Sequence, residues 1–229
     1  MQALKDVEKK IFNSRYDWDH IDVAVVRAEP EVLKLIHEAC LIESYFAVYT
    51  GKMMQLFWYD IEATSIFTLE AFEAYTHYYI LRKYLDVVGE QVVIDEEIIE
   101  LRKKDLKTVY DNEVRELVNF MMTEHFAAHY FIDLSAKTQE PVLKEILARL
   151  SKEEVTHSQF ASDLLAKRLE HDSSIRLKIV QAVRDYEHIG SYVLPTVSKV
   201  KEDNIKTIQS FNKKIESLIN QPMSDFTNQ

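Results

Sequence analysis

Residues 124–157 read EHFAAHYFIDLSAKTQEPVLKEILARLSKEEVTH, and this stretch determines the expected fold. Apolar residues recur every three or four positions on both sides of a polar turn at 137–141, which predicts an antiparallel pair of helices. Residues equidistant from the turn lie at the same height, so Glu124 should face Glu154. Glu154 and His157 leave one face of their helix, because they are three positions apart. A glutamate opposite a Glu-x-x-His pair is half of a dinuclear metal site in a four-helix bundle.

The other half of such a site is expected upstream. Glu43 and Glu73 are separated by 30 residues, which is also the separation of the two glutamates in the first hairpin, and their midpoint lies in Trp58-Tyr59-Asp60. This triplet predicts a turn in which Asp60 caps the following helix. His77 follows four residues after Glu73. Two hairpins of matching length, each with a carboxylate and an imidazole at mid-height, favour a metal site over packing alone.

The composition indicates a helical protein. The 229 residues include only three glycines and four prolines, and 47% are apolar. Sheets with tight turns need more glycine and proline, and the length suits one domain with a substantial core. We therefore predict a single all-α domain over residues 1–229, a four-helix bundle with additional N- and C-terminal helices. Its core helices are expected at about 30–57, 60–88, 109–136 and 140–170, with further helices at 3–13, 173–189 and 196–218.

Charge and cysteine content exclude several classes of protein. The net charge of −10 argues against nucleic-acid binding, which needs a basic face. Cys40 is the single cysteine, so an internal disulfide and a paired-cysteine zinc site are both excluded, which favours a reducing, cytoplasmic location. The chain opens without a signal peptide, and no run of about 18 uncharged apolar residues predicts a membrane span.

The candidate metal ligands are carboxylates and imidazoles at mid-height of the four core helices. A glutamate within an apolar stripe is costly to bury unless it is paired or bound to a metal. Hard oxygen ligands combined with imidazoles suit iron or manganese, so two Fe ions are expected, with replacement of one iron by manganese left open. His125 and His129 point aside from this face. The predicted ligands are Glu43, Glu73, His77, Glu124, Glu154 and His157.

The second core helix departs from the motif. A Glu-x-x-His pair ending at His77 would need an acid at position 74, which is Ala74. Glu73 is four residues before His77, about 40° away in projection, whereas Glu70 is seven residues before it, nearly in line and about one turn further down. We predict Glu73 as the sixth ligand. Replacement by Glu70, or loss of one metal position, remains open.

Two segments resemble a known family. Residues 153–160, EEVTHSQF, and residues 72–77, FEAYTH, resemble helices of the soluble acyl-carrier-protein desaturases, which belong to the ferritin-like di-iron carboxylate superfamily. The similarity covers most of residues 30–200. Two positions differ from the family pattern: its metal-binding acid falls on Ala74, and its threonine one turn after the third-helix glutamate falls on Ala127.

The resemblance implies a ferritin-like bundle in which a di-iron centre uses O2 and external electrons to oxidise an acyl chain. Its substrate would be a small molecule or an acyl-carrier-protein conjugate, its electron donor a protein such as a ferredoxin, and its assembly a homodimer. The best candidate for a carrier-binding basic patch is Arg102-Lys103-Lys104, although a solvated helix face explains these charges equally well. Two alternatives remain: a di-iron oxygenase acting on a small aldehyde or amine, and a non-catalytic, degenerate ferritin-like protein that binds metal.

Overall fold

The structure is a computed structural model that describes residues 2–12, 15–186 and 205–226. These residues form helices and short 3-10 turns, and no strand occurs among them. The all-helical prediction is therefore confirmed for the part of the chain that is described. The elements are α1 (Gln2–Phe12), η1 (Trp18–His20), α2 (Val23–Arg27), α3 (Pro30–Leu56), α4 (Ile61–Val88), α5 (Asp95–Lys104), α6 (Glu113–Lys137), α7 (Pro141–His171), α8 (Ile175–Arg184), α9 (Ile205–Ile219) and η4 (Met223–Phe226).

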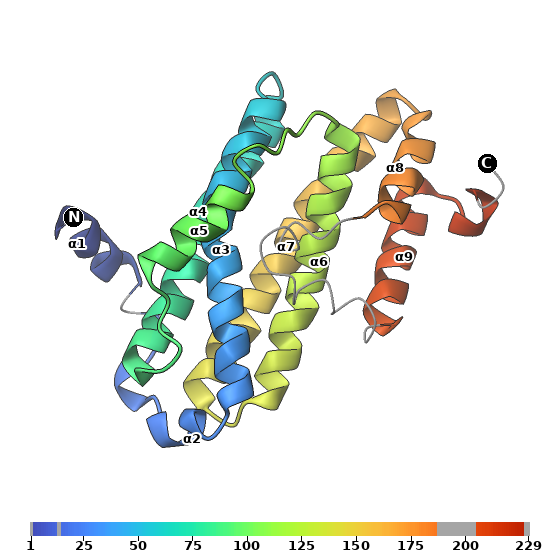
Figure 1. The fold of residues 1–229 in the computed structure, drawn as a ribbon. Coiled ribbons are helices and arrows are strands. Elements are labelled where there is room, and N and C mark those ends of the chain that lie inside the picture. Colours follow the sequence, from blue (N-terminus) through green and yellow to red (C-terminus); the bar gives the residue numbers. More distant parts are fainter. Residues whose placement is uncertain (1, 13–14, 187–204, 227–229) are drawn as a thin grey trace.

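Four long helices form two antiparallel hairpins, α3 with α4 and α6 with α7 (Figure 1). Their ends agree with the predicted core helices to within one residue, except that α6 begins at Glu113 and not near residue 109. The later start has a local cause, because the Asn112 side chain accepts a hydrogen bond from the Arg115 backbone N–H and caps the helix there. Contacts of α4 with α7 and of α3 with α6 join the hairpins into a bundle.

The turns of the hairpins are fixed by side chains that the sequence supplies. Asp60 accepts a hydrogen bond from the Ala63 backbone N–H at 3.0 Å, so the predicted cap of α4 is confirmed. Glu140 caps α7 by accepting from the backbone N–H groups of Val142 and Leu143, and Pro141 occupies the first turn. Each turn therefore starts its second helix at a defined residue, which sets the height of the residues that follow.

Gly89 ends α4 in the left-handed conformation, with φ of 72°. We expect Gly89→Ala to lower the free energy of unfolding by about 1 kcal/mol, because a Cβ is strained at this φ. Arg27 Nη2 would lie 3.5 Å from that Cβ, an ordinary contact, so the strain lies in the backbone. The matched control is Gly51→Ala within α3, where nothing lies within 4 Å of the added Cβ. The control should raise stability by roughly 0.5–1 kcal/mol, and chemical denaturation of both variants would reveal the opposite signs. Equal effects would contradict this account.

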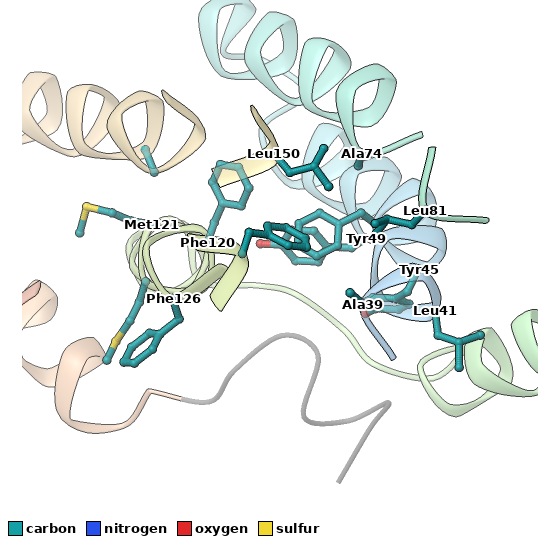
Figure 2. Packing of buried hydrophobic residues seen from close by; sticks show 14 of the residues in the cluster. Ala39, Leu41, Tyr45, Tyr49, Ala74, Leu81, Phe120, Met121, Phe126 and Leu150 are labelled. Carbon is teal, nitrogen blue, oxygen red and sulfur yellow. The ribbon is translucent and has the colours of Figure 1, made fainter. Parts of the chain in front are cut away.

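Aromatic side chains fill the bundle between the two hairpins. Figure 2 shows Tyr49 of α3 and Phe120 of α6 meeting there, with ring centroids 6.4 Å apart. Phe67 of α4 lies 5.2 Å from Phe120 and stacks on Phe57 at 5.6 Å. All four rings are fully buried. This packing fixes the rotation of the helices about their axes, and so decides which side chains face the interior.

The crossover between the hairpins is anchored to α3. Arg102 of α5 donates to the Ser44 backbone carbonyl from Nε at 3.2 Å and from Nη2 at 2.5 Å. Lys52 of α3 forms an ion pair with buried Asp105 at 2.8 Å. Lys103 pairs with Glu100 at 2.5 Å. Arg102 therefore has a structural contact, which weakens the Arg102-Lys103-Lys104 segment as a docking patch for an acidic carrier.

Segments that precede and follow the four long helices in the chain pack against the bundle. An N-terminal aromatic segment lies against α4, since Tyr16 is buried and Lys83 Nζ lies 4.1 Å from the ring centroid of Trp18. α8 packs on α6 and α7, and so does α9. Two C-terminal helices were predicted at 173–189 and 196–218; α8 and α9 occupy parts of these ranges, and residues 187–204 lie outside the described residues.

Candidate metal centre

Six acidic and histidine side chains meet inside the bundle at mid-height. Each of the four long helices contributes, and each of the six residues is at most 7% exposed. They form two groups in which one ligand atom from each member lies within 4.8 Å of the others. We call them the His77 site and the His157 site. The His77 site consists of Glu43, His77 and Glu154, and the His157 site consists of Glu70, Glu124 and His157.

Glu154 connects the two sites. Its Oε1 lies 2.9 Å from Nδ1 of His77, and its Oε2 lies 2.7 Å from Nδ1 of His157. The centroids of the two imidazole rings are 5.9 Å apart, and the ring planes are inclined by 30°. Nδ1 of each ring therefore lies close to the same carboxylate, which is where a ligand bridging two metal ions would lie.

Terminal carboxylates complete each site. Glu43 Oε2 lies 3.6 Å from His77 Nδ1. Glu70 Oε2 lies 3.1 Å from His157 Nδ1, and Glu124 Oε2 lies 4.0 Å from the same nitrogen. The His157 site thus has two carboxylates of its own in addition to the shared Glu154, and the His77 site has one.

The outer nitrogen of each imidazole is held by a carboxylate from the other hairpin. Nε2 of His77 lies 2.9 Å from Glu153 on α7, and Nε2 of His157 lies 2.6 Å from Glu73 on α4. Such partners fix the orientation of a metal-binding imidazole and its tautomer. Arg149 in turn donates to Glu153 at 2.9 Å. Each ring is therefore oriented so that Nδ1 is the nitrogen available to a metal.

Burial and proximity shift the pKa values of the cluster in a consistent pattern. Burial raises the pKa of Glu70 to about 8, against the opposing effect of His157. Burial, with the neighbouring carboxylates of Glu154 and Glu70, raises the pKa of Glu124 well above its usual value. Burial also raises the pKa of Glu43. These three terminal carboxylates therefore hold protons more tightly than carboxylates in water.

The two imidazoles and Glu154 shift as a charged group. Burial alone would lower the pKa of each imidazole, but carboxylates outweigh it, led by Glu154 at His77 and by Glu70 at His157, and both pKa values are raised. Burial would raise the pKa of Glu154, but the two imidazoles outweigh it and lower that pKa. An ionised Glu154 between two protonated imidazoles is thus the favoured state without a metal.

Three buried atoms of this cluster lack a hydrogen-bond partner among the described residues and are suited to bind a cation. Oε2 of Glu70, Oε1 of Glu124 and Nδ1 of His77 are buried without a hydrogen bond of acceptable geometry. Buried polar atoms are normally paired, because an unpaired one costs free energy. Two divalent ions at these groups would pair all three atoms. The two buried clusters of glutamate and histidine could therefore hold metal ions.

The structure brings five of the six predicted ligands together and replaces the sixth. Glu73 lies outside both sites, with 32% of its side chain exposed, and contacts the outer nitrogen of His157. Glu70 lies inside. The reason is the rotation of α4: Glu70 and His77 are seven residues apart, about 20° in projection, and this direction faces the interior. Glu73 is rotated from it towards the outer surface between α4 and α7.

Two histidines on α6 lie aside from the metal cluster, as expected. His125 Nε2 contacts Ser210 Oγ of α9 at 2.9 Å, and its ring is 4.9 Å from that of His129. Burial lowers the pKa of His125 to about 4. The sequence analysis did not predict Glu153 or Arg149 as site residues. The adjacent acidic residues at 153–154 are a signal that could have identified Glu153.

Metal affinity should rise with pH across the neutral range. A metal ion must displace the proton of Glu70, whose pKa is raised to about 8, and protons on the other raised groups. Below that pH the proton competes, so lowering the pH weakens binding. We expect the affinity for Mn²⁺ to be at least about tenfold weaker at pH 6.5 than at pH 7.5. Calorimetric titration in buffers of different ionisation enthalpy would also count the released protons. Equal affinity at the two pH values would contradict the protonated state of the cluster.

None of the protein-family models, curated proteins or solved structures compared with this chain matches it. Across the described ranges, no helix combines the length and the apolar character that crossing a bilayer requires.

Proposed function

We propose that this protein is an O2-dependent oxidase or oxygenase with a dinuclear iron centre in a ferritin-like four-helix bundle. The observation that carries the proposal is the position of Glu154 between the Nδ1 atoms of two imidazoles, at 2.9 and 2.7 Å, within a buried set of four glutamates and two histidines. Four carboxylates and two imidazoles from four helices are the ligand set of the di-iron carboxylate proteins.

The donor set favours iron or manganese over other transition metals. Carboxylate oxygens are hard ligands, and imidazole suits iron, whereas zinc and copper sites commonly include sulfur or are dominated by nitrogen. Cys40 is the only cysteine of the chain and is absent from both groups. An iron pair bound here would supply the reduction of O2 and the oxidation of a C–H or comparable bond.

The residues of the chain would prepare the site for that chemistry. Glu154 would set the separation of the two ions, while Glu43, Glu70 and Glu124 would supply negative charge. Glu73 and Glu153 orient the imidazoles by holding their outer nitrogens. The surrounding aromatic core excludes water, and exclusion of water limits side reactions of a strong oxidant.

We propose an acyl chain as the substrate, either free or bound to a carrier protein. Support comes from the resemblance of residues 153–160 and 72–77 to the acyl-carrier-protein desaturases and from the apolar interior beside the site. An external electron donor such as a ferredoxin and a homodimeric assembly belong to the same proposal. Because Arg102 is committed to α3, a free acyl substrate is as compatible with the surface as a carrier-bound one.

The test is anaerobic reconstitution with Fe²⁺, followed by exposure to O2 with a reductant and a candidate substrate. Two irons per chain, O2 consumption that depends on an acyl substrate, and an oxidised acyl product by mass spectrometry would support the proposal. Activity on a small aldehyde or amine, with acyl substrates inert, would keep the oxygenase and overturn the substrate. Bound iron without substrate-dependent O2 consumption would overturn catalysis and favour a metal-binding protein.

A further inference from the structure

The two metal sites differ, although the hairpins that form them are related by an approximate twofold repeat. Moving along the chain from one hairpin to the other, Glu43 corresponds to Glu124 and His77 to His157. The carboxylates that hold the outer nitrogens, Glu73 and Glu153, also correspond. If the two sites consisted only of these corresponding residues, their ligands would be the same.

The repeat is broken at two positions of α4 and α7. Ala74 occupies the position that corresponds to Glu154, and Leu150 occupies the position that corresponds to Glu70. Figure 2 shows the side chain of Leu150 directed towards Ala74, and both residues are buried. Position 74 thus carries no carboxylate, and the carboxylate on this part of α4 is that of Glu70, one turn earlier. Glu70 belongs only to the His157 site.

A second asymmetry in charge lies just outside the ligands. Glu153, which holds His77, is neutralised by Arg149 at 2.9 Å. Among the described residues, Glu73, which holds His157, forms an ion pair only with that imidazole, and 32% of its side chain is exposed. An ionised partner strengthens the imidazole as a ligand, and changing such partners typically alters metal affinity by 10–100-fold. Both asymmetries therefore add negative charge on the side of His157.

We propose that the two sites fill in sequence, with a divalent cation entering the His157 site at low concentration and the His77 site only at higher concentration. This inference rests on the metal centre of the proposed function but not on catalysis. Affinity for a cation rises with the number of anionic ligands. The His157 site has two carboxylates that it does not share with the other site, whereas the His77 site has one, so the His157 site should fill first. Stepwise filling also permits two different metals to occupy the centre, according to the order in which they are supplied.

The test is a titration of the metal-free full-length chain with Mn²⁺, in which the electron paramagnetic resonance signal of the free aquo ion reports unbound metal. We expect two binding events whose dissociation constants differ by at least about tenfold. Glu70→Gln should remove this difference by weakening the tighter event at least about tenfold. Glu43→Gln should leave the tighter event and weaken or remove the other one.

Two variants at partly exposed positions test the same inference without replacing a buried ligand. Glu73→Gln should weaken the tighter event, and Glu153→Gln the weaker event, each by about 10–100-fold. Two events of equal affinity would overturn sequential filling while leaving the dinuclear centre intact. Loss of the tighter event in Glu43→Gln would reverse the order and also overturn the inference. Absence of stoichiometric Mn²⁺ binding would overturn both the inference and the metal centre itself.

Discussion

Replacing Glu154 by alanine should abolish stoichiometric binding at both metal sites, the largest functional effect expected of any single substitution in this chain. The reason is its position, since its two oxygens lie 2.9 Å and 2.7 Å from the nitrogens that would bind the two ions. Without it the His77 site retains one carboxylate, and both imidazoles lose the carboxylate that lies beside their Nδ1 atoms, so each site loses an anionic ligand.

The measurement is metal content per chain after reconstitution with Fe²⁺ without oxygen and removal of excess metal. We expect two ions in the wild-type protein and fewer than about 0.2 in Glu154→Ala, which corresponds to at least a hundredfold loss of affinity for each ion. Glu154→Gln preserves the shape and should give the same loss, which separates charge from packing. Glu145→Ala, an exposed glutamate on the same helix, is the matched control and should keep both ions. Two ions retained in either Glu154 variant would show that this residue does not bridge the sites.

The hairpins were predictable because their determinants are local. Asp60 caps α4, Gly89 ends it, and Pro141 begins α7, and each of these acts through the backbone within a few residues. Periodic apolar residues then fix the length of each helix, and equal spacing from the turns fixes the height of the opposed glutamates. Five of the six residues in the two groups follow from this reasoning alone.

The choice between Glu70 and Glu73 could not be made from the sequence. The two residues are three positions apart, and each lies within 40° of His77 in projection, so either side chain could have faced the interior. The decision depends on how Phe67 and the other buried rings rotate α4 against its neighbours, which is a property of long-range packing. For the same reason, the sequence did not reveal that Glu73 and Glu153 would cross between hairpins to hold the imidazoles.

Glu140→Ala should cause a large loss of stability, although the residue lies outside the metal cluster. Its side chain is fully buried and accepts hydrogen bonds from the backbone N–H groups of Val142 and Leu143 and from the Tyr84 hydroxyl at 3.0 Å. Alanine leaves three buried donors unpaired and removes the cap of α7. Unpaired donors cost about 1–3 kcal/mol each before relaxation, so we expect a net loss of roughly 3 kcal/mol in the free energy of unfolding.

For a chain of this length, that loss corresponds to a fall in Tm of roughly 6–12 °C, measurable by circular dichroism or calorimetry on the metal-free protein. Glu140→Gln retains a carbonyl oxygen as acceptor and should lose about half as much, because one oxygen replaces two. Glu145→Ala, five residues further along α7 and exposed, should change stability by less than about 0.5 kcal/mol. A small effect in Glu140→Ala would mean that water reaches these donors, and that the turn between α6 and α7 is held by its backbone alone. A large effect would show that the buried hydrogen bonds of Glu140 hold the turn between α6 and α7 against α4.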